Sequence, residues 1–211
     1  MDVLIVESSS KTPAVESGLC LSVMTDITAL KQSEARNRRQ ALTDHLTGLM
    51  NRQGFETALD AEIAETDRQG GSLACLFVDL DRFKQVNDTL GHQSGDELIR
   101  AVGQRLQRLV GSNDTIARLG GDEFGIIHHA VTGLAGHLQL SGNIIEAVGK
   151  PFELDGGEAF VGVSIGVVEI EERDQNRREI VRKADIALYE AKSSGRNCAV
   201  AYEEAMDELL Q

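Results

Sequence analysis

The chain has 211 residues, of which 41% are hydrophobic and 26% are charged. This balance indicates one globular domain with some extra length and excludes an intrinsically disordered chain. The formal net charge of −13 argues against a nucleic-acid-binding surface, and any phosphate-bearing substrate would need local cations. No apolar run approaches the roughly 20 residues of a membrane span, so we expect no membrane contact by this chain.

The N-terminal segment differs from the rest of the chain. Apolar runs at 2–8 and 18–25 predict two short strands, and a two-stranded hairpin alone is marginally stable. The polar segment 29–44 lacks Gly and Pro and predicts a helix with only a weak heptad seam. We therefore divide the chain into residues 1–28, a linker helix over 29–42 and a main domain over 43–205.

The main domain alternates between helix-like and strand-like segments. Helices are predicted over 51–68, 95–110, 134–148 and 178–193, and strands over 73–79, 115–119, 123–129, 159–170 and 198–202. The βαββαβ core of this order predicts an α+β fold with a ferredoxin-like sheet. Of the three cysteines Cys20, Cys75 and Cys198, the last two lie in apolar runs. With no signal peptide visible, they indicate reduced thiols and a cytoplasmic location.

Three carboxylates follow predicted strand ends. Asp79 ends the apolar strand 73–79, and Asp122 and Glu123 follow two glycines at a predicted hairpin turn. If that hairpin lies beside the Asp79 strand, the three groups meet at one sheet edge. Hard oxygen ligands on a rigid sheet suit Mg²⁺ together with substrate phosphates. An ordinary Gly-Gly-acid turn is the common alternative, but the full string GGDEF has a chance occurrence on the order of 10⁻⁴ in this length.

The sequence resembles the GGDEF family of diguanylate cyclases over about residues 41–203. Five blocks carry the resemblance in order: DHLTGLMNR at 44–52, DLDRFKQVNDTLGHQSGDELI at 79–99, GGDEF at 120–124, SIGVV at 164–168 and ADIALYEAKSSGRN at 184–197. The resemblance implies a palm-like nucleotidyl cyclase fold. It also implies that two GTP molecules are condensed into cyclic di-GMP and two pyrophosphates by a homodimer, in bacterial second-messenger signalling.

The resemblance also implies roles for particular residues. Asp79, the Leu80 carbonyl, Asp122 and Glu123 match ligands of Mg²⁺ or Mn²⁺, and Asp122 and Glu123 match the catalytic pair, with Glu123 as a group that could activate the 3′-hydroxyl. The remaining positions match substrate-binding residues: Asn87 and Asp96 for guanine, Lys84, Lys192 and Arg196 for phosphate, and Phe83, Gly120 and Gly121 for the surrounding cradle. Lys192 and Arg196 share a face if their helix continues through both.

One position departs from the family pattern. Many members carry Arg-x-x-Asp before the motif, where the product binds and inhibits the enzyme, and here Gly111 replaces the arginine while Asp114 remains. We therefore expect weak product inhibition. Residues 18–34 resemble the last strand and exit helix of a PAS sensor domain, which implies an upstream sensor in the full protein. Two rival hypotheses remain: a non-catalytic nucleotide-binding or scaffold domain of the same fold, and a dimerisation module acting through residues 20–45.

Overall fold

The computed structural model describes residues 3–10, 19–26, 40–65, 72–171 and 176–210. The chain divides into two compact units, Met1–Ala41 and Leu42–Gln211, and each is described by itself. In the first unit, β1 (Val3–Ser10) and β2 (Leu19–Asp26) form an antiparallel hairpin, as the apolar runs predicted.

The predicted helix over 29–44 extends too far. Residues 27–39 lie outside the described part of the chain, but residues 42–51 form a turn instead of a helix. The Asp44 carboxylate accepts hydrogen bonds from the Thr47 amide at 2.9 Å and its hydroxyl at 2.7 Å. Gly48 closes the turn with φ 74°. Local bonds from a short acidic side chain compete with helix formation, which explains the early end.

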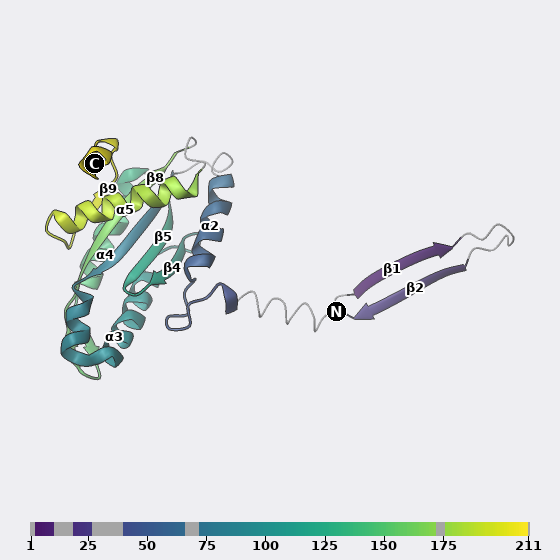
Figure 1. The fold of residues 1–211 in the computed structure, drawn as a ribbon, viewed down its shortest axis with the longest axis horizontal. Helices are drawn as coiled ribbons and strands as arrows, with labels where there is room; N and C mark the ends of the chain where they lie inside the picture. Colours follow the sequence, from purple (N-terminus) through teal and green to yellow (C-terminus); the bar gives the residue numbers. More distant parts are fainter. Residues whose placement is uncertain (1–2, 11–18, 27–39, 66–71, 172–175, 211) are drawn as a thin grey trace. The chain divides into compact units, whose positions relative to one another are not determined.

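The second unit is built on a five-stranded sheet of order β4-β5-β3-β8-β9 (Figure 1). The strands are β3 (Ser72–Asp81), β4 (Thr115–Gly120), β5 (Glu123–Ala130), β8 (Gly162–Ile170) and β9 (Ala199–Ala201). All neighbours are antiparallel except β8 and β9. The central strand β3 is almost wholly buried. This arrangement confirms the predicted α+β, ferredoxin-like core.

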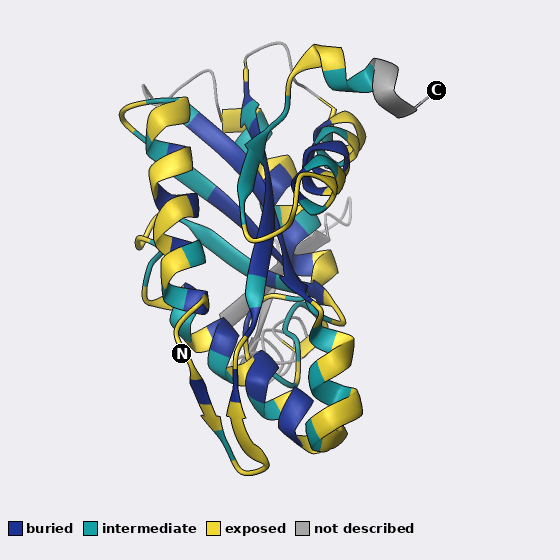
Figure 2. Cartoon of the chain, turned by 90° about the vertical axis from the view of Figure 1, so that its left-hand side faces the viewer, coloured by how far each residue is buried: buried dark blue, intermediate teal, exposed yellow. Residues whose placement is uncertain are grey.

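Helices cover both faces of the sheet, and the central strands lie buried between them (Figure 2). One apolar core lies under α3 (Phe83–Gln107) and α4 (Leu134–Val148). The other lies under α2 (Arg52–Glu65) and α5 (Arg177–Ser193). Successive side chains of a strand alternate between faces, and Phe77 belongs to the α2/α5 core. Asp79 and Asp81 continue its series and therefore face α5.

Two predicted elements of this unit differ markedly from the observed ones. The helix predicted over 95–110 begins at Phe83, and the chain is non-helical at Gly91, where φ is 86° and ψ is 162°. The strand predicted over 159–170 is two strands: β7 (Gly157–Ala159) pairs with β6 (Phe152–Leu154), and β8 starts after a break at 160–161. A 3₁₀ helix, η1 (Glu204–Leu210), ends the described chain.

Among the described residues, no helix is both long enough and apolar enough to span a lipid bilayer.

Candidate active site at the end of the central strand

Asp79 is a buried carboxylate at the end of β3. On the sheet it lies opposite Glu123 of β5 on one side and Ser164 of β8 on the other. Its Oδ2 is 2.8 Å from Nζ of Lys192, which reaches it from the last turn of α5. Burial raises the pKa of Asp79 even though Lys192 opposes the shift, and the charges of Asp122 and Asp81 raise it further. The site therefore holds more negative charge than its lysine neutralises.

The glycine turn between β4 and β5 brings Asp122 to the same place. The strand register shifts between Arg118 and Gly120, and Gly120 and Gly121 have φ values of 144° and 54°. Such dihedral angles favour glycine. The Leu80 amide donates to the Asp122 carbonyl at 3.3 Å, which ties the turn to the end of β3. Burial raises the pKa of Asp122, and the charge of Glu123 adds to the shift.

The three predicted carboxylates thus lie together where β3 ends and β5 begins. Glu123 is half-exposed, and its Oε2 is 3.5 Å from an Arg52 guanidinium nitrogen. In the described residues, no three His, Cys, Asp or Glu side chains are arranged as a ready-made metal cage. Asp79 is instead paired with Lys192 and Glu123 with Arg52, so a cation would need substrate oxygens to complete its ligands.

Two arginines that sequence reasoning missed support the glycine turn. Arg118 donates from Nε and Nη2 to the Gly121 carbonyl at 3.0 and 2.8 Å, and its Nη1 lies 3.2 Å from the Asp44 carboxylate. Arg52 donates to the Leu119 carbonyl at 3.1 Å. The signal available in the sequence was the position of Arg118 two residues before the motif glycines. Through these bonds the glycine turn is held against Asp44 and Arg52, which lie near the start of the domain.

The predicted guanine-binding residues lie on either side of the Gly91 break in α3. A Cβ atom at Gly95 would stand 1.9 Å from Asn87 Oδ1, so only glycine lets the Asn87 side chain pack there. The Phe83 ring lies on the same spot, 3.3 Å from that Cβ position. Asp96 follows at once and is exposed. The break therefore brings the Asn87 amide close to the exposed Asp96 carboxylate. Together these two groups can form hydrogen bonds with the edge of a nucleobase.

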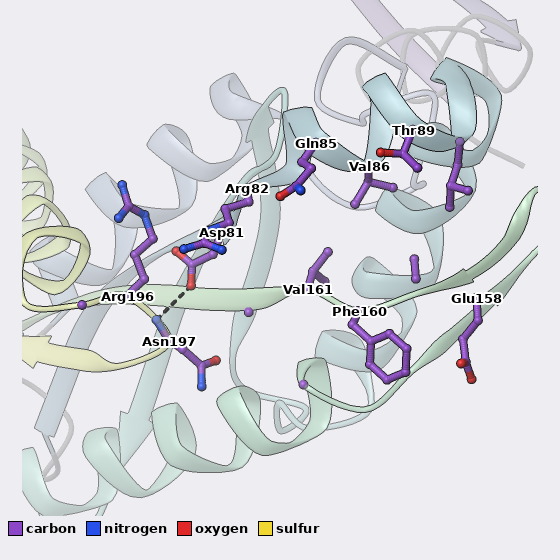
Figure 3. Close-up of a pocket in the computed structure, with 15 residues that line it drawn as sticks. Asp81, Arg82, Gln85, Val86, Thr89, Glu158, Phe160, Val161, Arg196 and Asn197 are labelled. Atoms are coloured by element: carbon purple, nitrogen blue, oxygen red, sulfur yellow. Dashed lines mark hydrogen bonds between the residues drawn. The ribbon is translucent and has the colours of Figure 1, made fainter.

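The predicted phosphate cations are distributed differently than expected. Lys192 contacts Asp79, and Lys84 is exposed on α3. Arg196 does not share a helix face with Lys192, because α5 ends at Ser193. Instead Arg196 has φ 66° in the following turn and lines a pocket of about 660 Å³ together with Asp81 and Arg82 (Figure 3). The condition for a shared helix face, a helix that continues through both cations, is therefore not met.

Asp114, the remaining residue of the inhibitory pattern, is engaged within the protein. Its Oδ2 accepts from the Gly111 amide at 2.7 Å and its Oδ1 from the His129 amide at 2.9 Å. Its side chain is 7% exposed. The carboxylate therefore serves the turn before β4 and has little capacity left for a ligand.

The sheet order, the helices on both faces and the carboxylates at the end of β3 define a palm-like nucleotidyl cyclase domain. More specifically, the chain belongs to the GGDEF family: the family model described as "Diguanylate cyclase, GGDEF domain" matches residues 41–198.

Individual proteins agree with this assignment. The chain is 37% identical over 186 residues to the bifunctional diguanylate cyclase/cyclic di-GMP phosphodiesterase MucR of Pseudomonas aeruginosa, covering 86% of this chain and 27% of MucR. The solved GGDEF domain of TpbB (YfiN) from Pseudomonas aeruginosa has a TM-score of 0.76 at 34% identity, covering 80% of this chain and 99% of that one. The coiled coil and GGDEF domain of DgcB from Caulobacter crescentus, in complex with c-di-GMP, also scores 0.76, at 31% identity, covering 83% and 93%.

The chain spans about a quarter of the length of several curated relatives that it matches. The PAS-like assignment of residues 1–28, the linker over 29–42 and the limits 43–205 stay predictions.

Proposed function

We propose that this domain is a diguanylate cyclase that condenses two GTP molecules into cyclic di-GMP and two pyrophosphates, as a homodimer, in second-messenger signalling. One observation carries the proposal above the others. Asp79, Asp122 and Glu123 meet at the end of the central strand with Lys192 reaching into the same place. Family membership and the relatives named as diguanylate cyclases support the same reaction.

A divalent cation, Mg²⁺ or Mn²⁺, fits these residues. Asp79 and Asp122 are partly buried carboxylates whose pKa values are raised by burial and by neighbouring acidic groups. Excess negative charge on hard oxygen atoms is what such a cation neutralises. Asp79, Asp122, Glu123 and the Leu80 carbonyl would hold it. When bound, the metal would polarise the α-phosphate and neutralise charge on the leaving pyrophosphate.

The chain's own residues supply recognition and proton transfer. Asp96 accepts hydrogen bonds from guanine N1 and N2, with Asn87 beside it, which disfavours adenine. Lys192 moves from Asp79 to the phosphates, and Lys84 and Arg196 add charge. Glu123 accepts the proton of the attacking 3′-hydroxyl. In each of two steps the 3′-oxygen bonds to an α-phosphorus and the bond from that phosphorus to pyrophosphate breaks.

Two copies of the chain are needed because each offers one set of guanine-reading residues. Each 3′-hydroxyl must attack the α-phosphate held by the other copy. The negative charge of −13 opposes tight self-association, so we expect a monomer–dimer equilibrium.

Incubation with GTP and Mg²⁺, followed by nucleotide chromatography, tests the proposal. The wild-type chain should release cyclic di-GMP and pyrophosphate, and Asp122→Asn should not. Asp60→Asn is the matched control, because Asp60 pairs with Arg177 on the surface away from the site. Binding of GTP without any product would instead support the non-catalytic nucleotide-binding hypothesis.

A further inference from the structure

The proposed guanine-reading residues lie on two sides of a helix break that does not fix its own geometry. Asn87 precedes Gly91 and Asp96 follows it, and the Gly91 backbone is non-helical, with φ 86° and ψ 162°. Gly91 is exposed, and a Cβ atom placed there would meet nothing within 4 Å. Because glycine adopts many backbone conformations, Gly91 alone does not set the angle between the two halves of α3. Besides the packing of Asn87 on Gly95, that angle depends on contacts with other elements.

The tip of the β6–β7 hairpin lies directly against this break. A Cβ atom at Gly156 would overlap the Ser94 hydroxyl oxygen and would stand 3.3 Å from the Leu90 carbonyl oxygen. Leu90 is the last residue before Gly91, and the buried Ser94 lies three residues after it. Gly156 lies outside the left-handed region, in contrast to Gly157 with φ 124°. Glycine is therefore needed at position 156 for the close approach to α3, whereas the turn itself uses Gly157.

A hydrogen bond ties the same tip to the second half of α3. The Asp155 amide donates to Glu97 Oε2 at 3.0 Å, and Glu97 directly follows Asp96 in the sequence. A hydrogen bond to a charged acceptor is stronger than a neutral one. The tip thus contacts α3 on both sides of the break, next to the residue that is proposed to read guanine.

The base of the hairpin is anchored on the second half of α3. Arg105 donates to the carbonyls of Ala147, Lys150 and Pro151 at 2.9, 2.6 and 2.5 Å. The central carbon of its guanidinium lies 3.5 Å from the centroid of the buried Phe152 ring. The hairpin is therefore fixed to one half of α3, and its tip can set the position of the other half.

We infer that the hairpin tip positions the guanine-reading residues: Gly156 and Glu97 set the spacing of Asn87 and Asp96 and so sharpen the preference for guanine. The inference rests on the proposed function. Gly156 and Glu97 are positioning residues, because they act through Asn87 and Asp96 and not by touching the base. Recognition groups must be held within about 0.5 Å of the productive geometry. A displaced tip should therefore weaken base discrimination and leave phosphate binding nearly unchanged.

Calorimetric titration with 3′-deoxy-GTP and 3′-deoxy-ATP in the presence of Mg²⁺ tests this inference. Both compounds lack the attacking hydroxyl and differ only in the base, so the ratio of their dissociation constants reports base recognition. Gly156→Ala should weaken binding of the guanine compound about tenfold and leave the adenine compound nearly unchanged, because hydrogen bonds to the guanine edge are lengthened. Gly142→Ala in α4 is the matched control and should have no effect, because a Cβ atom there meets nothing within 4 Å.

Further variants separate positioning from a general loss of structure. Adding Ser94→Ala to Gly156→Ala removes the hydroxyl that the new Cβ would overlap, so the double variant should regain most of the guanine preference relative to Ser94→Ala alone. Glu97→Ala removes the bond from the Asp155 amide and should reduce the preference about threefold. Glu97→Gln keeps an acceptor oxygen and should restore part of that loss.

An equal loss of affinity for both compounds, or an unchanged ratio in Gly156→Ala and Glu97→Ala, would overturn the role of the hairpin while a guanine preference in the wild-type chain leaves the proposed function intact. If Gly156→Ala does not fold, the ratio in Glu97→Ala decides. A wild-type chain that does not distinguish the two compounds would overturn both the guanine assignment and this inference.

Discussion

The two ends of β3 carry polar clusters that differ in how completely they are paired. At its start, Ser72 donates to Glu169 and lies 2.9 Å from His137 Nε2, and the Nδ1 atoms of His128 and His137 are 2.9 Å apart. Because the Ser72 proton goes to the carboxylate, His137 Nε2 must donate. Its Nδ1 then accepts from His128 Nδ1. Every donor in this chain of bonds meets an acceptor.

At the other end of β3 the polar groups are not balanced. Asp79 and Asp122 have pKa values raised by burial, and Arg82 and Arg196 have no partner among the described side chains. A cluster satisfied internally stabilises the fold, whereas one with charge left over is suited to a ligand. By this criterion the histidine cluster is structural, and the end of β3 that carries Asp79 is the proposed site.

Replacing Asp122 should have the largest effect of all the changes, a large loss of activity without a loss of stability. We expect Asp122→Asn to lower cyclic di-GMP formation by about 10²–10³-fold, because charge stabilisation at the reacting phosphate is lost. A carboxylate with a raised folded-state pKa costs stability once pH exceeds its unfolded value of 3.8. At neutral pH the variant should therefore unfold at the same or a higher temperature. A variant that retains activity would remove Asp122 from the mechanism.

Changing the guanine-reading residues should have the next largest effect. Asp96→Ala should reduce the preference for GTP over ATP by about 10- to 100-fold, because hydrogen bonds to a charged acceptor are lost. Competition by ATP in a GTP turnover assay measures this preference. Asp88→Ala is a useful control, since Asp88 is an exposed aspartate on the same helix. Equal turnover of GTP and ATP by the wild-type chain would contradict the assignment.

The histidine cluster at the start of β3 should behave in the opposite way, because a change there should lower stability and leave turnover nearly unaffected. His137→Leu removes the acceptor of His128 Nδ1 and leaves Ser72 with Glu169 as its hydrogen-bond partner. It should lower the free energy of unfolding by about 1–3 kcal/mol, with turnover changed only slightly. Chemical denaturation and a turnover assay on the same sample measure both quantities. A large loss of turnover without loss of stability would show that the cluster takes part in the reaction.

The same cluster predicts a pH dependence. Burial lowers the pKa of His137 from 6.5 to about 4 and also lowers the pKa of His128. The charges of His128 and His129 lower the His137 pKa further, whereas those of Glu169 and Asp114 oppose the shift. A depressed histidine pKa means that the stability is present above pH 6.5 and is lost as pH falls through about 4. The melting temperature should fall across this window, and less steeply in His137→Leu.

The smallest effect is expected at the degenerate inhibitory position. Gly111→Arg supplies the missing guanidinium, but a Cβ there would lie 3.3 Å from Asp114 Oδ2, and that carboxylate is already bonded. We therefore expect the substitution to tighten cyclic di-GMP binding by less than about tenfold, a weaker gain than the sequence pattern alone suggested. Calorimetric titration of cyclic di-GMP gives the change. Sub-micromolar, non-competitive inhibition of the wild-type chain would show that another residue replaces the arginine.

Sequence reasoning recovered the sheet and the motif carboxylates, because strand alternation and the GGDEF string are local signals. It missed the first half of α3, where polar residues before Gly91 give no apolar periodicity. It also missed β6 and β7, which are only three residues each. Short elements depend on tertiary packing more than on pattern.

The supporting residues of the site could not be predicted from the sequence for a different reason. Asp81 acts through a hydrogen bond to Asn197, 116 residues away in sequence. The left-handed backbone of Arg82 has no signature, because arginine has no preference for that conformation. Burial and the charge of Glu123 raise the pKa of Asp185, so this residue of α5 also lies within the electrostatic field of the site.

In the proposed function, the end of β3 that carries Asp79 forms an active site, and two copies of the chain must work as a pair. The rate of cyclic di-GMP formation from GTP and Mg²⁺, measured over a wide range of chain concentration with sedimentation at the same concentrations, tests it most directly. We expect the rate of product formation to rise faster than linearly with chain concentration where monomers dominate, and we expect no product from Asp122→Asn at any concentration. Product at constant specific activity from a chain that sediments as a monomer, or no product even where dimers prevail, would contradict it.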